Sequence, residues 1–551
     1  MSRLPATLVL VPLALAAGAA DAQSRGGDRG GEKRAATYVS PYIEATQIVS
    51  ADLTNDDTVT YTSLAAGVDA GIATARTEGQ VSYRYERRFG WGKNDGDESL
   101  HSGLLRGSHQ LTRNLSIEAG AIATRSRYDS RGADSPLYGV DTNNVTQVYS
   151  AYAGPTFSAM SGPIQLNALY RLGYTKVETP DTLLVAPGQP RGDYYDDSTS
   201  HLATASAGFA AGTLLPVGVT VSGAYEREDA GQLGGRYEGY YGRADATAPL
   251  SRTLAVRAGV GYEKIETSER DPLLDAAGVP VLDRNGRYRT DPNSPRRIAY
   301  NTDGLIYDAG VVWRPSTRLE LQANAGWRYG SEYYTGSLSY RMRRDMGLQV
   351  VVYDGIQTFG RQLRDGLAGL PTSFQTTRDP FGQQFGGCVF GSQPGAANGN
   401  AGGCLDRVFQ SISGASYRAR GIDAILSVSR GPEEYGIGVG YANRRFFAPR
   451  RTFGLIYYGT EDESLYGQAF WSRQLDSSSS FDFNAYAGWS TSGVRGFDGD
   501  KDVFGTGMTG TYFRSFGRVG ALASLGVYAY DQDNFDSNVS AQALLGARYQ
   551  F

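Results

Sequence analysis

Ten charged side chains recur at alternate positions of segments whose other positions are apolar. They are Arg84, Glu86, Arg88, Glu118, Arg171, Arg257, Glu263, Glu320, Arg328 and Asp423. Burying such groups in an apolar core is costly, whereas the wall of a water-filled passage keeps them hydrated. Arginines and carboxylates along one passage create a transverse field that favours hydrated polar solutes over lipophilic ones. We therefore interpret these ten residues as candidates for the lining of a lumen.

Catalytic chemistry finds little support in the sequence. Of the three histidines, His101, His109 and His201, the first two fall on one face of a predicted strand, about 27 Å apart. They are too distant to share a metal ion or a proton. The chain has neither a Gly-x-Ser-x-Gly elbow nor a glycine-rich phosphate loop. Acidic stretches such as 52–57 fit solvated loops or divalent-cation sites, but none has full Ca²⁺-loop spacing. We expect no enzymatic activity, no metal centre and no cofactor.

The two cysteines, Cys388 and Cys404, predict a disulfide if the chain reaches an oxidising compartment. Closing a loop of this size contributes about 3 kcal/mol in the chain-entropy model. Two free thiols are the alternative.

Residues 1–22 have the pattern of a secretory signal peptide. Arg3 gives a positive start, an apolar run covers 8–19, and Ala20-Asp21-Ala22 forms a small-x-small cleavage site. The apolar run is too short to span a membrane as a helix; a buried N-terminal helix is the alternative. Residues 23–36 are glycine-rich, charged and aperiodic, and predict a flexible periplasmic lead-in. The net charge of -4 argues against a nucleic-acid partner.

From residue 37 to residue 551 the hydrophobic pattern has a period of two. The alternation is clearest in 164–174, 254–263, 319–329 and 481–490. Successive side chains of a strand point to opposite faces, whereas a helix would scatter these residues around a cylinder. Short connections alternate with long ones, the longest at about 359–415. This arrangement predicts a meander of about 22 strands, within a range of 20–24, with short turns on one rim and long loops on the other.

Closure of this sheet and its contact with lipid follow from two arguments. A flat sheet of such width would expose two edges, and a sandwich core could not hold the charged face. Aromatic residues near strand ends suit membrane interfaces, and in lipid only helices and closed barrels pair every backbone group. We predict an all-β fold for 37–551: a single-chain antiparallel transmembrane up-and-down β-barrel of the bacterial outer membrane, with short periplasmic turns and long extracellular loops.

The C-terminus resembles the final strand of Gram-negative outer-membrane β-barrel proteins, which alternates and ends in an aromatic residue that the insertion machinery recognises. Ala547, Tyr549 and Phe551 match this signal. The resemblance implies outer-membrane lipid and lipopolysaccharide, the barrel-insertion machinery and periplasmic chaperones as partners. The start YVSPYIEATQ and the single-domain layout also resemble uncharacterised large proteobacterial outer-membrane barrels associated with exopolysaccharide systems.

A barrel of about 22 strands is too wide for wall side chains to fill, so it holds water or a plug. TonB-dependent receptors share this strand count but carry a plug domain before the barrel. Only 14 residues lie between the predicted cleavage site and the first strand, so we expect no receptor of that type. The loop at 359–415 either folds into the lumen or is displayed outside. The sequence favours a porin-like channel for small polar solutes; a non-transport surface barrel and a conduit for exopolysaccharide export are the alternatives. No sequence feature specifies an oligomeric state.

Overall fold

The computed structural model describes residues 36–551 except 55, 92–97, 128–144, 179–194, 284–286, 376–378, 383–386, 395–398, 411, 448, 450–459, 495–500 and 534–536. The predicted signal peptide, and the lead-in up to residue 35, lie outside the described residues.

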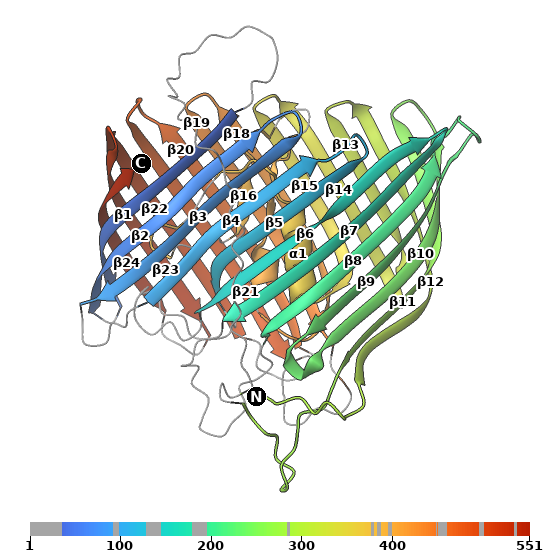
Figure 1. The fold of residues 1–551 in the computed structure, drawn as a ribbon, viewed down its shortest axis with the longest axis horizontal. Coiled ribbons are helices and arrows are strands. Elements are labelled where there is room, and N and C mark those ends of the chain that lie inside the picture. The colour runs from blue at the N-terminus through green and yellow to red at the C-terminus, as the bar shows by residue number, and fades with distance from the viewer. Residues whose placement is uncertain are drawn as a thin grey trace. The chain divides into compact units, whose positions relative to one another are not determined.

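Within the described residues, 22 strands form one antiparallel sheet in chain order (Figure 1). The first eleven are β1 Ala36–Asp52, β2 Asp57–Ala73, β3 Thr77–Gly90, β4 Glu98–Gln110, β5 Leu115–Arg127, β6 Val145–Ser161, β7 Ile164–Glu178, β8 Asp197–Phe209, β9 Gly218–Ala230, β10 Arg236–Pro249 and β11 Leu254–Glu269. The other eleven are β12 Arg297–Ser316, β13 Leu319–Arg328, β14 Ser331–Arg343, β15 Met346–Gln357, β18 Tyr417–Arg430, β19 Glu433–Phe446, β20 Thr460–Gln474, β21 Ser479–Val494, β22 Lys501–Phe516, β23 Val519–Gln532 and β24 Asn538–Gln550.

The last strand pairs with the first and closes the sheet into a ring. The register between β1 and β24 runs from Tyr42 opposite Gln550 to Asp52 opposite Ser540. Closure leaves no edge strand with unpaired backbone groups, which is what a wall in contact with lipid requires. The predicted all-β, up-and-down antiparallel barrel of about 22 strands is confirmed.

Turn lengths separate the two rims of the barrel. β1 starts and β24 ends at the same rim, here called the short-turn rim, where connections run from two residues (162–163) to eight (210–217). The opposite long-loop rim carries connections such as 270–296 and 358–416. The predicted strict alternation of lengths is wrong at several places, since the long-loop rim also has the short connections 53–56, 231–235 and 329–330, all shorter than 210–217 on the other rim. Tyr329 and Gly330 have φ values of 56° and 70°, as a type I′ hairpin turn requires.

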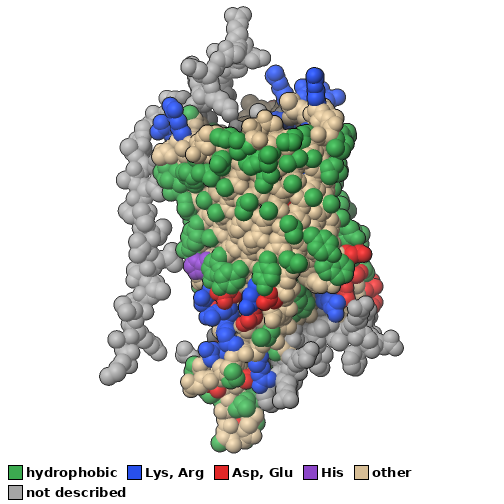
Figure 2. Space-filling view, turned by 90° about the vertical axis from the view of Figure 1, so that its right-hand side faces the viewer, with side chains coloured by type: hydrophobic (Ala, Val, Ile, Leu, Met, Phe, Trp, Pro, Cys, Tyr) green, Lys and Arg blue, Asp and Glu red, His purple; other side chains and the backbone are tan. Residues whose placement is uncertain are grey.

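Apolar side chains cover the outside of the strands (Figure 2). Leu305, Leu525 and Leu545 are 71%, 69% and 68% exposed, and each is flanked by neighbours that point inward. In Figure 2, carboxylates gather below this apolar surface, and lysines and arginines lie both above and below it rather than within it. An apolar band around a closed ring is the surface that a bilayer covers.

The connection between β15 and β18, residues 358–416, has secondary structure of its own and is called here the inserted segment. It contains α1 Phe359–Gly369, the strands β16 Cys388–Phe390 and β17 Gly402–Cys404, and α2 Asp406–Phe409. A 3₁₀ turn, η1 Gln232–Gly234, lies elsewhere, after β9. α1 contacts β5, β6, β7 and β8 from inside the ring, and β17 contacts β18 and β19 (Figure 1). Of the two possibilities for this loop, the structure has the inward one. The helices of the described residues are all short, and none could cross a membrane.

Candidate functional site

Helix α1 carries an apolar stripe that faces the barrel wall. Phe359, Leu363 and Leu367 recur every four residues and are fully enclosed, which is the spacing of one helical face. They pack against inward-facing apolar side chains of four neighbouring strands, which are Leu104, Ile122, Val148 and Val177. We call this part of the inner face, on β4–β7, the covered wall. Burial of these side chains fixes the helix against it.

The other face of α1 is charged and bonds to β9. Arg361 and Arg364 both pair with the carboxylate of Glu226. The backbone N–H of Arg361 donates to Glu228 at 3.1 Å, and its guanidinium lies 3.5 Å from the ring centroid of Tyr237. Two arginines that share one carboxylate away from bulk water form a strong, directional anchor.

A disulfide hairpin anchors the far side of the inserted segment. Cys388 and Cys404 lie opposite each other in the β16–β17 pair and are bonded, with an S–S length of 1.99 Å. The N–H of Cys388 donates to the side-chain oxygen of Gln468 on β20 at 2.7 Å. A Cβ on Gly438 of β19 would lie 2.3 Å from Sγ of Cys388, so the wall needs glycine there for the hairpin to approach.

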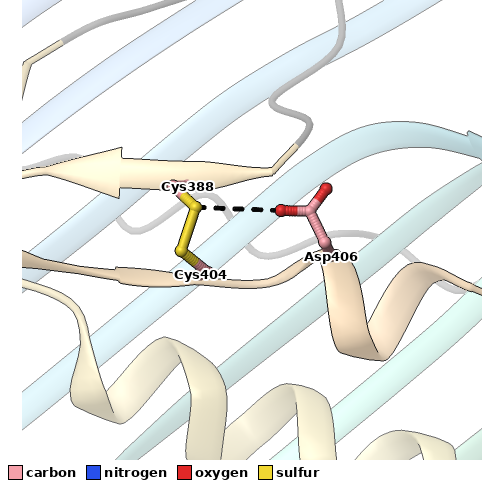
Figure 3. A group of neighbouring side chains, drawn as sticks. All are labelled: Cys388, Cys404 and Asp406. Atoms are coloured by element: carbon pink, nitrogen blue, oxygen red, sulfur yellow. Dashed lines mark hydrogen bonds between the residues drawn. A yellow bond between two sulfur atoms is a disulfide. The ribbon is translucent and has the colours of Figure 1, made fainter. Parts of the chain in front are cut away.

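Asp406 points from the start of α2 toward this disulfide, as Figure 3 shows, with Oδ2 3.8 Å from Sγ of Cys388. In the described residues, Cys388, Cys404 and Asp406 are the one group of three side chains close enough to share a metal ion. The two sulfurs are bonded to each other and offer no thiolate, so this group is not a metal site while the disulfide is intact. Burial, and then the charge of Asp423, raise the pKa of Asp406 to about 7.

Further contacts hold the end of α1 and the part of the inserted segment that follows it. Arg106 of β4 donates to the backbone oxygens of Leu370 and Ala368, at 3.1 and 3.0 Å. On β3, Arg88 donates to the backbone oxygen of Phe381. The hydroxyl of Tyr528 on β23 donates to Asp379 at 2.9 Å. The inserted segment is therefore tied to the wall at several places around the ring.

The ten predicted lumen residues take part in ion pairs, and they fall into two groups. Arg88 and Asp423 contact the inserted segment, Asp423 through Arg407 of α2 at 2.9 Å. The other eight pair within the wall, and Arg88 also has a partner there. The pairs are Arg84 with Glu44 and Glu86, Arg88 with Glu86, Arg171 with Glu118, Arg257 with Asp245, Arg328 with Glu263, and Arg314 with Glu320.

A second network, on β10–β12, contains one predicted residue, Arg257, and three that were not predicted: Arg243, Asp245 and Asp308. Arg243 pairs with Asp245 and with Asp308, the latter at 3.0 Å, and Arg257 joins through Asp245 at 3.0 Å. We call the inner face of β10–β13 that carries these residues and Glu320 the charged wall. Among the residues that the structure describes, Arg243 and its partners bond to one another and not to the inserted segment. Arg243 and Asp245 lie two residues apart on β10 and so share one face of that strand, which was a signal that sequence analysis could have used.

The histidines and the C-terminal residues lie apart from this site. The Nδ1 atoms of His101, His109 and His201 lie 2.7, 2.7 and 2.8 Å from the hydroxyls of Tyr83, Thr77 and Tyr170. Phe551 is 65% exposed, and its N–H donates to the backbone oxygen of Pro41 at 3.2 Å. Recognition of Ala547, Tyr549 and Phe551 by the insertion machinery stays a prediction.

Comparison with known proteins gives a likeness in fold only. No family model matches the sequence, and no curated protein matches it. The FrpB iron transporter from Neisseria meningitidis has 9% identity and a TM-score of 0.40, over 93% of this chain and 82% of that one. The ferric-catecholate import receptor Fiu from E. coli K12 has 10% identity and a TM-score of 0.42, over 93% and 81%. The siderophore receptor PiuA from Acinetobacter baumannii has 9% identity and a TM-score of 0.39, over 92% and 82%.

Likeness at these values carries no argument about ligand or activity. The closed ring and its apolar outer band define the class of this chain: it is an outer-membrane β-barrel of the Gram-negative type. Within that class it is a 22-stranded barrel whose lumen holds a segment inserted between β15 and β18.

Proposed function

We propose that this barrel is a selective channel, in which small polar solutes pass between the inserted segment and the charged wall. One observation carries the proposal. The inserted segment is anchored at strands that include β3, β9, β18, β20 and β23. On the charged wall, Arg243, Asp245, Arg257 and Asp308 bond to one another, and among the described residues none of these four bonds to that segment. Paired charges along a passage let a polar solute exchange hydration for wall contacts without a large electrostatic barrier. The same passage disfavours lipophilic solutes.

The anchored segment also bears on the alternatives. A conduit for a polysaccharide chain needs a wide lumen, so the anchors at Glu226, Asp423 and Arg88 would have to break first. A non-transport surface barrel requires a lumen that stays closed, with no passage along the charged wall. We propose no enzymatic role, because in the described part of the chain the imidazole of each histidine has a hydroxyl group, and no carboxylate, as its hydrogen-bond partner.

Conductance of the refolded full chain in a planar bilayer tests the proposal. We expect small, stable openings from the wild type and much larger ones after deletion of residues 362–412, which removes both cysteines together. The matched control deletes 274–282 in the long-loop hairpin whose bridge joins Leu274 and Pro280, and it should leave conductance unchanged. Absence of openings in the wild type and in the 362–412 deletion would instead support a non-transport barrel.

A further inference from the structure

Three arginines of the charged wall pair with three carboxylates, and the arginines are the more exposed partners. The arginine side chains are 16–32% exposed, whereas the carboxylate side chains are 3–7% exposed. The arginines are Arg243, Arg257 and Arg328, and the carboxylates are Asp245, Asp308 and Glu263. Although the charges balance, a solute in the passage lies closer to the guanidinium groups, so the nearest charge that it meets is positive.

Arg243 is fully engaged in holding the two aspartates. Its Nε and Nη2 donate to Asp245, and its Nη1 and Nη2 bond to Asp308 at 3.0 and 3.1 Å. The side chain reaches from β10 to β12 and crosses β11 at Gly259, where a Cβ would lie 2.1 Å from Nη2. Glycine at position 259 therefore lets Arg243 lie flat on the wall, with one carboxylate at each side of its guanidinium group.

Arg257 and Arg328 use only one side of their guanidinium groups. Nε and Nη2 of Arg257 both bond to Oδ1 of Asp245, at 3.2 and 3.0 Å. Nε and Nη2 of Arg328 both bond to Oε2 of Glu263. In the part of the chain that the structure describes, Nη1 of these two arginines has no hydrogen bond. Because a guanidinium group carries five N–H donors in a planar fork, the end formed by Nη1 and the second N–H of Nη2 can still hold two oxygens of an oxyanion.

The two unbonded ends are too far apart to hold one small anion together. Glu263, which holds Arg328, follows Arg257 by six residues on β11, a span of about 20 Å along an extended strand. Each end therefore acts alone, and Arg243, opposite Gly261, lies between them. Conduction requires several sites that each release the solute readily, and a single guanidinium end whose charge is shared with a carboxylate is a site of this kind.

We propose that Arg257 and Arg328 are two successive binding sites for small oxyanions such as carboxylates, and that the passage therefore prefers anions to cations. The carboxylates of the wall stay enclosed beneath the arginines, so an anion can bind without displacing them. This inference names the solute class of the proposed channel and rests on that channel.

Reversal potentials of the refolded full chain in a planar bilayer, under a gradient of potassium acetate, test the solute class. We expect the wild type to prefer acetate to potassium. Arg257→Gln removes one anion site and leaves Asp245 paired with Arg243, so the ratio of acetate to potassium permeability should fall about twofold or more. Arg257→Lys keeps the positive charge and should retain most of the preference.

Arg473→Gln is the matched control, because it removes the same charge from a pair on the outer side of the barrel. Arg473 pairs with Glu433 at 3.3 Å, and Glu433 shares its face of β19 with the exposed Ile437. R473Q should keep the wild-type reversal potential.

Failure of this inference and failure of the channel give different results. Wild-type openings without a preference for acetate would overturn the anion sites and leave the channel intact, and this measurement needs no variant. A preference that R257Q leaves unchanged, or that R473Q lowers equally, would also overturn them. Absence of openings in the wild type would reject the channel and, with it, the anion preference.

Discussion

The covered wall and the charged wall belong to one ring, yet their inner faces differ. On β4–β7, inward positions hold Leu104, Ile122, Val148 and Val177, and helix α1 packs on them. On β10–β12, inward positions hold Arg243, Asp245, Arg257 and Asp308, which bond to each other. The difference teaches that an inner face is not uniformly polar: where part of the chain folds into the lumen, the wall beneath it has the composition of a core.

Loss of the Glu226 carboxylate should give the largest difference in mutational effect between the covered wall and the charged wall. Glu226→Gln removes the carboxylate that Arg361 and Arg364 share, and leaving buried guanidinium groups without it costs about 3–5 kcal/mol. We expect α1 to detach from the wall while the barrel stays intact. Amide hydrogen exchange should show faster exchange in 359–369, and single-channel conductance should rise.

Glu320→Gln is the matched control on the charged wall. Its partner Arg314 is well exposed, with 58% of the side chain accessible, and a solvent-exposed ion pair of this kind contributes about 0–1 kcal/mol. Equal effects of E226Q and E320Q on exchange in 359–369 would mean that the two walls do not differ as described.

The sequence predicts the ring better than the contents of its lumen. Strand number, closure and outward-facing leucines follow from a period of two, because that period is a local property of the backbone. Leu104 and Ile122 lie at inward positions and mark the covered wall, but nothing local shows which loop covers them. Gly438 of β19 shows the same limit of sequence analysis. The sequence indicates only a glycine within a strand, and the need for glycine at this position follows from the disulfide hairpin that lies beside it.

A side chain at Gly438 should destabilise the docked disulfide hairpin, with an effect smaller than that of Glu226→Gln. Gly438→Ala puts a Cβ 2.3 Å from Sγ of Cys388, and such overpacking costs about 1–3 kcal/mol. Gly304→Ala, on β12, is the control, since a Cβ there meets no atom within 4 Å. Reduction of the disulfide by a soluble thiol, followed by mass spectrometry, should be faster in G438A than in G304A or the wild type. Unchanged reduction in G438A would show that β19 does not hold the hairpin.

The smallest expected effect is a dependence of segment docking on pH. Docking raises the pKa of Asp406 from its ordinary value near 3.8 to about 7. The docked state therefore binds the proton more tightly, so its stability is fully present below the ordinary pKa and is lost as the pH rises through about 7. Between about pH 6 and pH 8 the change is on the order of 1 kcal/mol.

Hydrogen exchange in 402–409, corrected for the intrinsic dependence of exchange on pH, measures that change. The wild type should show weaker protection at pH 8 than at pH 6, and Asp406→Asn should show the same protection at both, because its amide does not titrate. Glu320→Gln, on the charged wall, should keep the wild-type difference. A pH dependence that persists in D406N would show that another group titrates. It would also show that Asp406 does not control the docking of the inserted segment.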